Sequence, residues 1–239
     1  MTVHPSPRAN VGVPSLAVAF CPSTPLLLPT VAGGAAPETA DLRRACAEAL
    51  ATVLGRGPDV VVVVGAGEPG ARYGAGDAGS LRGFGVDLAV SSAGPARRGG
   101  QRLPLAHTIG AWLLDEAGWS GPRIGVSDAD LADVAGALDG QVELLAVGDG
   151  SARRTLKAPG HLDRAAEPFD ASVAAALRDG DAAALAALDA GEGERLLAAG
   201  VPTWGAVGRL VGERPVQATL RYDGAPFGVG YLVADWVVT

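Results

Sequence analysis

The amino-acid sequence predicts an α/β fold: a single domain with a mostly parallel central sheet, flanking helices and a C-terminal β-hairpin that extends the sheet. Three patterns indicate this fold. Short apolar runs alternate with longer segments of helical spacing. Five consecutive valines at residues 60–64 are typical of a strand covered on both faces. Two alternating segments near the C-terminus, separated by a Gly/Pro turn, are typical of a hairpin.

The first part of the chain predicts a strand–helix–strand unit. Residues 16–20 are a short apolar run that predicts a buried strand. Residues 22–37 contain four prolines and predict a loop. A helix is expected at residues 37–54, because Pro37 and Glu38 suit the first turn of a helix. The valine strand then completes the unit.

The remaining elements follow from the same patterns. Residues 65–85 hold eight glycines and predict a long loop after the valine strand. Further strands are expected at residues 86–90, 124–126 and 142–147, and in the hairpin at 216–222 and 229–237. Helices are expected at residues 103–117, 128–138 (capped by Asp128), 168–177, 181–188, 192–199 and 202–211.

Length and cysteine usage limit the number of domains and the compartment that we expect. Its 239 residues suit one sizeable domain, which we place at residues 15–239 after a flexible tail at 1–14. Cys21 and Cys46 are too few for a disulfide framework, so a reducing, cytoplasmic location is expected. The longest apolar runs are interrupted well before the roughly 20 residues of a membrane span.

The charge balance argues against a nucleic-acid partner. The chain has 19 basic and 26 acidic residues, a net charge of −7. Proteins that bind nucleic acid gain affinity by neutralising phosphates and show a basic patch. The close basic pairs here, such as Arg97-Arg98, are too few to form one.

The predicted topology also locates a pocket. In open α/β sheets, ligands bind beyond the carboxyl ends of the parallel strands. Three irregular segments, at residues 21–34, 65–85 and 148–164, are expected to meet there. The last segment carries Arg153, Arg154 and Lys157, which suit a carboxylate or phosphate. The alternative is a solvated loop whose cations pair with neighbouring acidic side chains.

Other constellations give weaker hypotheses. Residues 65–70 match the GxGxxG pattern of dinucleotide-binding loops, but the later glycines disfavour the helix that such a site needs. Ser151 follows a strand, yet nothing in the sequence fixes His107 or His161 as its base. The histidines also lack the spacing of a metal site.

Several glycine- and proline-rich landmarks occur in a familiar order. They are CPSTPLLLP at residues 21–29, GAG at 65–67, LPL at 103–105, GDGS at 148–151, KAPG at 157–160 and YDGAPFGVGY at 222–231. With these landmarks the chain resembles the subunit-B-like class III extradiol ring-cleavage dioxygenase superfamily, in a stand-alone uncharacterised branch. The resemblance covers roughly residues 15–237.

The resemblance implies an iron enzyme, but the matching positions have changed. Active members hold a non-haem Fe²⁺ with two histidines and a glutamate, and use a further histidine as acid and base. The metal histidines correspond to Ser23 or Thr24 and to residues 65–68, and the acid/base histidine to Ala152. For the metal glutamate, Asp223 is the nearest acidic candidate. We therefore expect no iron, no other cofactor and no dioxygenase activity.

These considerations lead to one expectation with several alternatives. We expect the chain to bind a small polar or anionic molecule at the strand ends. The candidate residues are Ser23, Thr24, Glu68, Asp149, Ser151, Arg153, Arg154, His161 and Asp223. The alternatives are a metal-independent enzyme in the same cleft, a nucleotide-binding protein using Gly65–Gly70, and an interaction protein. The interaction protein includes the case of a homodimer. Its interface would be marked by four large side chains if they were exposed: Trp204, Trp236, Phe227 and Tyr231.

Overall fold

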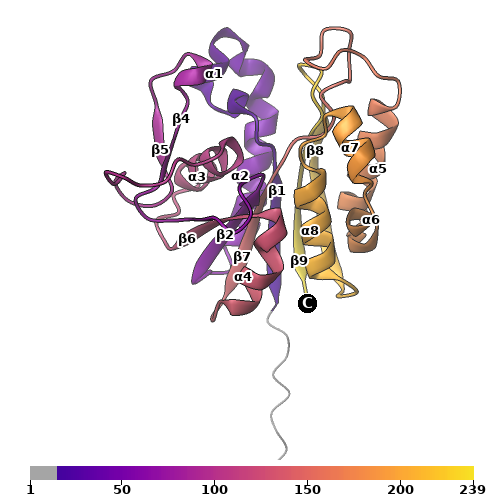
Figure 1. Ribbon diagram of the computed structural model, residues 1–239. Coiled ribbons are helices and arrows are strands. Elements are labelled where there is room, and N and C mark those ends of the chain that lie inside the picture. The colour runs from indigo at the N-terminus through magenta and orange to yellow at the C-terminus, as the bar shows by residue number, and fades with distance from the viewer. Residues whose placement is uncertain (1–14) are drawn as a thin grey trace, which may run out of the picture.

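A computed structural model describes residues 15–239 and has a seven-stranded sheet at its centre (Figure 1). The tail predicted at residues 1–14 lies outside the described residues. The strand order is β3-β6-β2-β7-β1-β9-β8. The sheet strands are β1 (Leu16–Cys21), β2 (Val60–Gly65), β3 (Arg72–Tyr73), β6 (Arg123–Ser127), β7 (Val142–Val147), β8 (Val216–Gly224) and β9 (Tyr231–Val238).

The predicted fold class is confirmed. Strands β6, β2, β7 and β1 run parallel to one another. The hairpin of β8 and β9 adds to the sheet beside β1, with β9 antiparallel to β1. At the other edge, the two-residue strand β3 is antiparallel to β6. The parallel centre and the appended hairpin form one compact domain.

Alternation along the strands explains why the apolar runs are continuous. In β1, Ala17 and Ala19 join one core, whereas Val18 and Phe20 join the core on the opposite face. The valines of β2 divide between the two cores in the same way. Because side chains of a strand alternate between faces, a strand buried on both sides needs an apolar residue at every position.

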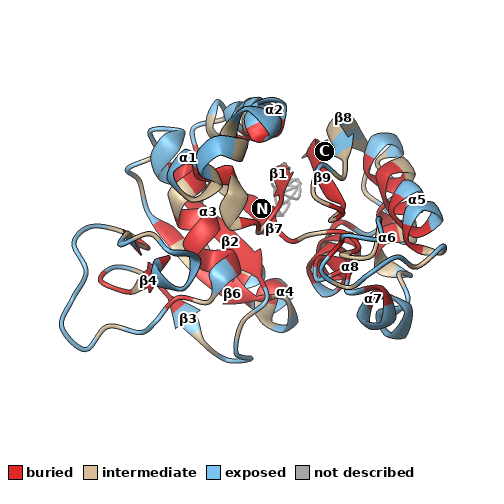
Figure 2. Ribbon diagram, turned by 90° about the horizontal axis from the view of Figure 1, so that it is seen from above, coloured by how far each residue is buried: buried red, intermediate tan, exposed pale blue. Residues whose placement is uncertain are grey.

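Helices cover both faces of the sheet, as Figure 1 shows. The core that includes Ala17 is closed by α2 and α3, and the core that includes Phe20 by α4, α5, α6 and α8. Seen from above, the buried residues concentrate between these layers (Figure 2). The α-helices are α1 (Pro29–Ala32), α2 (Ala40–Leu54), α3 (Leu105–Glu116), α4 (Leu131–Ala137), α5 (Ala166–Asp179), α6 (Ala182–Ala186), α7 (Ala190–Leu196) and α8 (Val201–Val211).

Four local expectations differ from the structure. Residues 65–85, expected to form one long loop, contain β3, which joins the main sheet, as well as β4 (Ala78–Ser80) and the turn η3 (Arg82–Phe84). The proline-rich segment expected to be a loop forms short helical turns, η1 (Pro25–Leu27), α1 and η2 (Gly33–Thr39), because proline suits the first turn of a helix. The strand expected at residues 86–90 is instead β5 (Ala89–Ser91), which pairs with β4 outside the main sheet. Asp128 does not cap α4; it opens the turn η4 (Asp128–Asp130) that precedes it.

The aromatic residues near the C-terminus belong to the core. Trp204, Trp236 and Tyr231 are at most 2% exposed, and Phe227 is partly buried. An interface built on an exposed cluster of these side chains is therefore not available. Among the described residues, no helix combines the length and the apolar character that a membrane span requires.

The parallel strands end together at the upper edge of the sheet in Figure 1. At this edge the end of β7 touches the turn before α8 very closely. A Cβ atom added to Gly148 would lie 2.4 Å from the Cα atom of Gly200. The Gly200 amide donates a hydrogen bond of 2.7 Å to the Asp149 carbonyl oxygen. Glycine at residue 148 thus allows two backbones to meet where the strands end.

Gly148→Ala is expected to lower the free energy of unfolding by about 2 kcal/mol, in the range of overpacking, because backbone cannot move aside as a side chain can. Gly136→Ala is the matched control. It lies inside α4 with nothing within 4 Å of an added Cβ, so the substitution should stabilise the helix by about 0.5–1 kcal/mol. Urea unfolding of both variants measures the difference; equal effects would contradict it.

Candidate functional site

Ser23 and Asp149 meet at the carboxyl ends of β1 and β7. The Ser23 amide donates a hydrogen bond of 2.8 Å to Asp149 Oδ1, and its hydroxyl donates one of 2.9 Å to Oδ2. Both residues are partly buried. The strands lie side by side, so their ends bring together two residues that are 126 positions apart. Both residues are candidates from the sequence, and the structure joins them.

Burial shifts the ionisation of Asp149. Loss of solvent around the carboxyl group raises its pKa from 3.8 to about 6, and the two hydrogen bonds from Ser23 oppose that rise. A carboxyl group with this pKa exchanges a proton near neutral pH, which an ordinary surface aspartate does not.

Thr24 and Tyr231 lie next to this pair. The Tyr231 hydroxyl donates a hydrogen bond of 3.1 Å to Thr24 Oγ1, and both residues are buried. Burial, with a smaller contribution from the Asp149 charge, raises the Tyr231 pKa to about 12. Tyr231 therefore remains a neutral donor. We call Ser23, Thr24, Asp149 and Tyr231 the strand-end cluster.

Ser151 and Arg154 hold the backbone in place. The Ser151 hydroxyl donates to the Leu196 carbonyl oxygen at 2.7 Å, and its amide donates to Asp170 Oδ1 at 2.8 Å. Arg154 forms an ion pair of 2.9 Å with the fully buried Asp170 carboxylate. These contacts fasten the loop after β7 to α5 and to the end of α7, so neither side chain is a free group.

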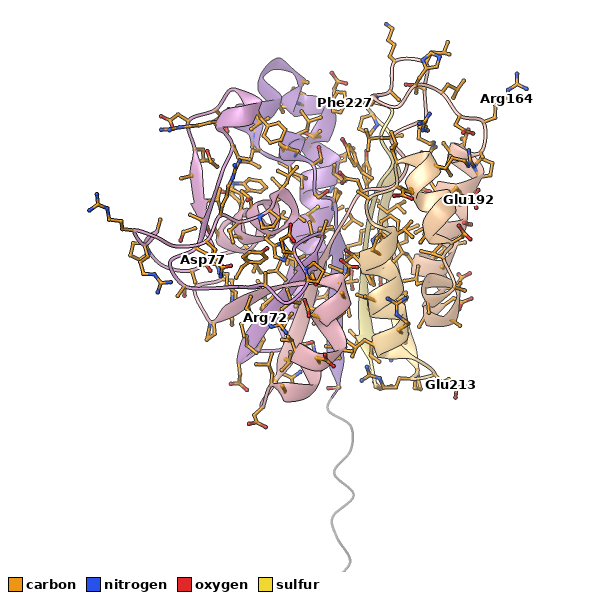
Figure 3. All side chains as sticks on the ribbon, viewed as in Figure 1. Arg72, Asp77, Arg164, Glu192, Glu213 and Phe227 are labelled. Carbon is orange, nitrogen blue, oxygen red and sulfur yellow. The ribbon has the colours of Figure 1, made fainter. Side chains whose placement is uncertain are left out.

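The cations of this loop differ in their partners. Arg153 donates to the Gly160 carbonyl oxygen at 2.8 Å, within its own loop. Lys157 is exposed and forms no ion pair with any residue from 15 to 239. It borders an open hollow of about 560 Å³ shared with Leu156 and Phe227, here called the Lys157 hollow. Figure 3 shows Phe227 at the end of the molecule where the strands terminate.

The other candidate residues lie apart from the strand-end cluster. Glu68 is exposed in the turn after β2. His161 is exposed, and its Nδ1 lies 3.0 Å from the Leu156 carbonyl oxygen of its own loop. Asp223 is exposed near the end of β8. In the described part of the chain, no hydrogen bond or ion pair joins these three residues to the cluster.

His107 is a buried histidine of α3 near the end of β2. Its Nε2 lies 2.9 Å from the Val126 carbonyl oxygen, and its ring packs 4.7 Å from that of Tyr73. Burial lowers its pKa, although the hydrogen bond to Val126 opposes this. The ring rests beneath the glycine turn after β2: a Cβ added to Gly67 would lie 3.2 Å from Cε1. His107 supports that turn and does not reach Ser151.

The donor set does not fit the iron site of the resembled family. Hydroxyl groups and one carboxylate stand at the strand ends where that site needs two histidines and a glutamate. Within residues 15–239, no three His, Cys, Asp or Glu side chains gather in a way that could hold a metal ion. We therefore derive no step through iron.

The GxGxxG alternative lacks its structural context as well. A dinucleotide site needs a helix to begin inside the glycine loop, so that its amides meet the pyrophosphate. Residues 66–71 instead form turns, and strand β3 follows them. No family model matches this chain, and no curated protein shows significant sequence similarity to it.

The structure also shows site residues that the sequence analysis did not select. Tyr231 was considered only as a core or interface aromatic, because nothing in the sequence pairs it with Thr24. A hollow of about 490 Å³ is lined by residues of α7 and α8, which were predicted only as helices. The short helices and glycines at residues 190–200 were the available signal, but they do not by themselves indicate a cavity.

The raised pKa of Asp149 predicts how stability varies with pH. Ionising the carboxyl group is harder in the folded chain, so its contribution to stability is complete below about pH 4 and is lost as pH rises through about 6. The loss is at most about 3 kcal/mol, at about 1.4 kcal/mol per pKa unit. In urea unfolding, Asp149→Asn should gain stability relative to the wild type between pH 4 and pH 8.

Ser23→Ala is the companion variant. It removes a donor that favours the ionised form, so the pKa of Asp149 should rise further and the pH-dependent loss should grow. A difference between Asp149→Asn and the wild type that does not vary with pH would contradict this account.

Asp170 gives an independent test of the loop. Asp170→Ala leaves the largely buried guanidinium of Arg154 without its partner and should lower the free energy of unfolding by about 3–5 kcal/mol. Glu167→Ala on the same helix is the control. Glu167 is 80% exposed and lies 3.6 Å from Arg154, so its loss should change stability by less than about 1 kcal/mol. Similar values from chemical denaturation would show that Asp170 does not anchor the loop.

Proposed function

We propose that this protein binds a small polar molecule at the carboxyl ends of β1 and β7, with Asp149 as the group that accepts a hydrogen bond or a proton from it. The observation that carries the proposal is the paired Ser23–Asp149 contact. It fixes a carboxyl group of pKa about 6 at the edge of the sheet where α/β proteins bind ligands.

The geometry leaves Asp149 capacity for a ligand. Each carboxylate oxygen accepts one hydrogen bond from Ser23, whereas a carboxylate oxygen has two acceptor positions. Two donors of Ser23 already hold the carboxyl group in one orientation. Little conformational entropy is therefore lost at this group when a ligand binds. A hydroxyl or amine of a small molecule is the complementary group.

The proposal agrees with the family resemblance in position but not in chemistry. We propose that the chain keeps the extradiol-dioxygenase-like arrangement of strand ends and has exchanged the iron ligands for hydroxyls and a carboxylate. A proton-transfer enzyme without a metal would use the same cluster, with Asp149 as its base. The cytoplasmic location and the absence of a nucleic-acid partner remain predictions from the sequence.

A second candidate is the binding of a small anion in the Lys157 hollow. The observation that favours it is an exposed ammonium group beside the apolar surface of Leu156 and Phe227. This arrangement suits a carboxylate with an apolar body. Arg153 and Arg154, which the sequence analysis grouped with Lys157, are occupied by Gly160 and Asp170.

A fragment titration followed by amide NMR tests the proposal. Glycerol, catechol and ethanolamine probe the strand-end cluster, and benzoate probes the Lys157 hollow. At pH 8 we expect one of the first three to shift the amides of Ser23 and Gly150. Its affinity should fall as pH drops through about 6, because protonation removes the acceptor. Asp149→Ala should abolish the shifts, while Lys157→Gln leaves them unchanged.

The result also decides between the two candidates. Benzoate binding that Lys157→Gln removes, with no response at Ser23, would show that the ligand binds in the Lys157 hollow and not at the strand-end cluster. Binding at Ser23 that does not depend on pH between 5 and 8 would contradict the role of Asp149.

A further inference from the structure

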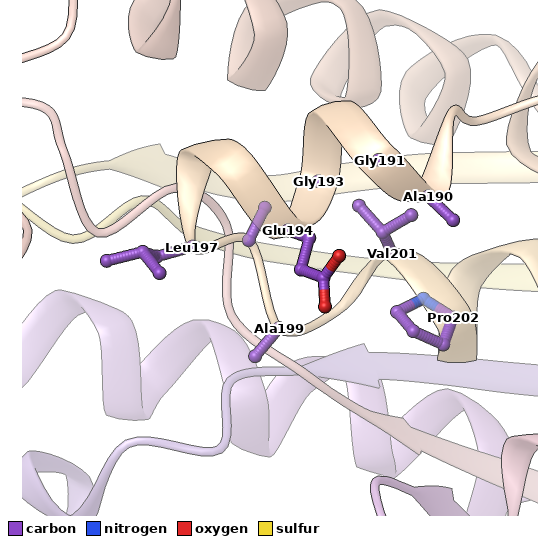
Figure 4. Close-up of a pocket in the computed structure, with 9 residues that line it drawn as sticks. Ala190, Gly191, Gly193, Glu194, Leu197, Ala199, Val201 and Pro202 are labelled. Atoms are coloured by element: carbon purple, nitrogen blue, oxygen red, sulfur yellow. The ribbon is translucent and has the colours of Figure 1, made fainter.

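A second hollow lies between α7 and the start of α8 and uses none of the residues of the strand-end cluster. Its volume is about 490 Å³, within the size range of small-molecule pockets. Figure 4 shows the side chains of Leu197, Ala199, Val201 and Pro202 around it. Apart from one carboxylate, that of Glu194, its side chains are apolar.

The packing of α7 against α8 shapes one side of this hollow. A Cβ added to Gly193 would lie 2.8 Å from Val201 Cγ2, so glycine allows α7 to approach α8 on that side. The chain then turns sharply at Leu197, whose φ of 55° is in the left-handed region that favours glycine. A bulky residue at this position is strained, and its side chain remains 45% exposed at the rim.

Strain at an exposed apolar side chain is a pointer to function. A glycine would end the helix at lower conformational cost but would remove the apolar surface that Leu197 supplies. One end of the Leu197 side chain touches Gly160, and the rest faces solvent beside the hollow. The leucine thus supplies contact area for a ligand.

Glu194 gives the hollow its charge. Figure 4 shows its carboxylate directed into the space between Ala199 and Pro202. Within residues 15–239 this carboxylate has no ion pair and no hydrogen bond, whereas Glu192 on the same helix lies 3.4 Å from Arg195. A carboxylate beside an apolar surface is complementary to a cation that carries a hydrocarbon group.

We propose that the α7–α8 hollow binds a small organic cation, an amine with a compact hydrocarbon body. The ammonium group pairs with the Glu194 carboxylate, and the hydrocarbon body lies against Leu197, Ala199 and Val201. A small anion is disfavoured by the same carboxylate, which separates this ligand class from the one that suits the Lys157 hollow.

Three matched probes test the proposal: 2-phenylethylamine, 2-phenylethanol and 3-phenylpropanoate, which differ mainly in charge. We expect the amine to shift the amides of residues 190–202 in an NMR titration. It should bind about fivefold more tightly than the alcohol, as expected for one partly exposed ion pair. The carboxylate should bind most weakly.

Variants distinguish the contribution of the Glu194 charge to binding from the contribution of the hollow itself. Glu194→Gln should remove the preference for the amine and leave the alcohol unchanged, while Glu192→Gln, the matched control, should alter neither. Ala199→Phe places a ring at an exposed position on the hollow and should abolish binding of both probes. Its NMR spectrum outside residues 190–202 should match the wild type.

Other outcomes would overturn the proposal. They are equal affinity for the amine and the carboxylate, an amine preference that survives Glu194→Gln, or no shift at residues 190–202 at millimolar amine. A dimer in light scattering that Ala199→Phe converts to a monomer would assign the hollow to a second copy of the chain instead.

Discussion

The short turn that follows β7 is the constraint on which the upper edge of the molecule depends. Gly148 donates to the Cys21 carbonyl oxygen at 3.0 Å, and Asp149 accepts from Ser23 and from the Gly200 amide. Gly150 donates to the Gly230 carbonyl oxygen at 2.7 Å. Three consecutive residues therefore join the end of β1, the residue before β9 and the α7–α8 turn. Because buried backbone groups must be paired, this turn leaves little freedom to the segments around it.

The same constraint explains why Asp149 can serve as a chemical group. An aspartate at a loosely held loop would rotate into water and keep an ordinary pKa. Here the backbone of Asp149 is fixed by Gly200, and its carboxyl group is oriented by Ser23. Its raised pKa follows from burial that the hydrogen bonds only partly offset. Position, orientation and ionisation of this group thus arise from one set of contacts.

Charged residues near the strand ends divide into structural and available groups. Asp170 and Arg154 neutralise each other below the surface and secure the loop. Lys157 and Glu194 stay at the surface beside two separate hollows. The charges of an ion pair inside the protein bind each other and are not accessible to a ligand. An exposed charge next to apolar surface can recognise a ligand of opposite sign. The two hollows carry opposite charges and so favour different ligand classes.

The sequence by itself determined the layered α/β fold, because strands buried on both faces require continuous apolar runs such as the valines of β2, and helices show their own spacing. It also indicated Asp149, which follows a strand, and the family resemblance indicated Ser23, at the position expected of a metal ligand. Only the tertiary structure decided which candidates meet: Ser23 bonds to Asp149 because β1 and β7 are neighbours, whereas Glu68 and His161 form no hydrogen bond with either residue. The α7–α8 hollow depends on the distance between two helices and on the conformation of Leu197. Strand order and helix contacts are long-range properties, which local spacing does not encode.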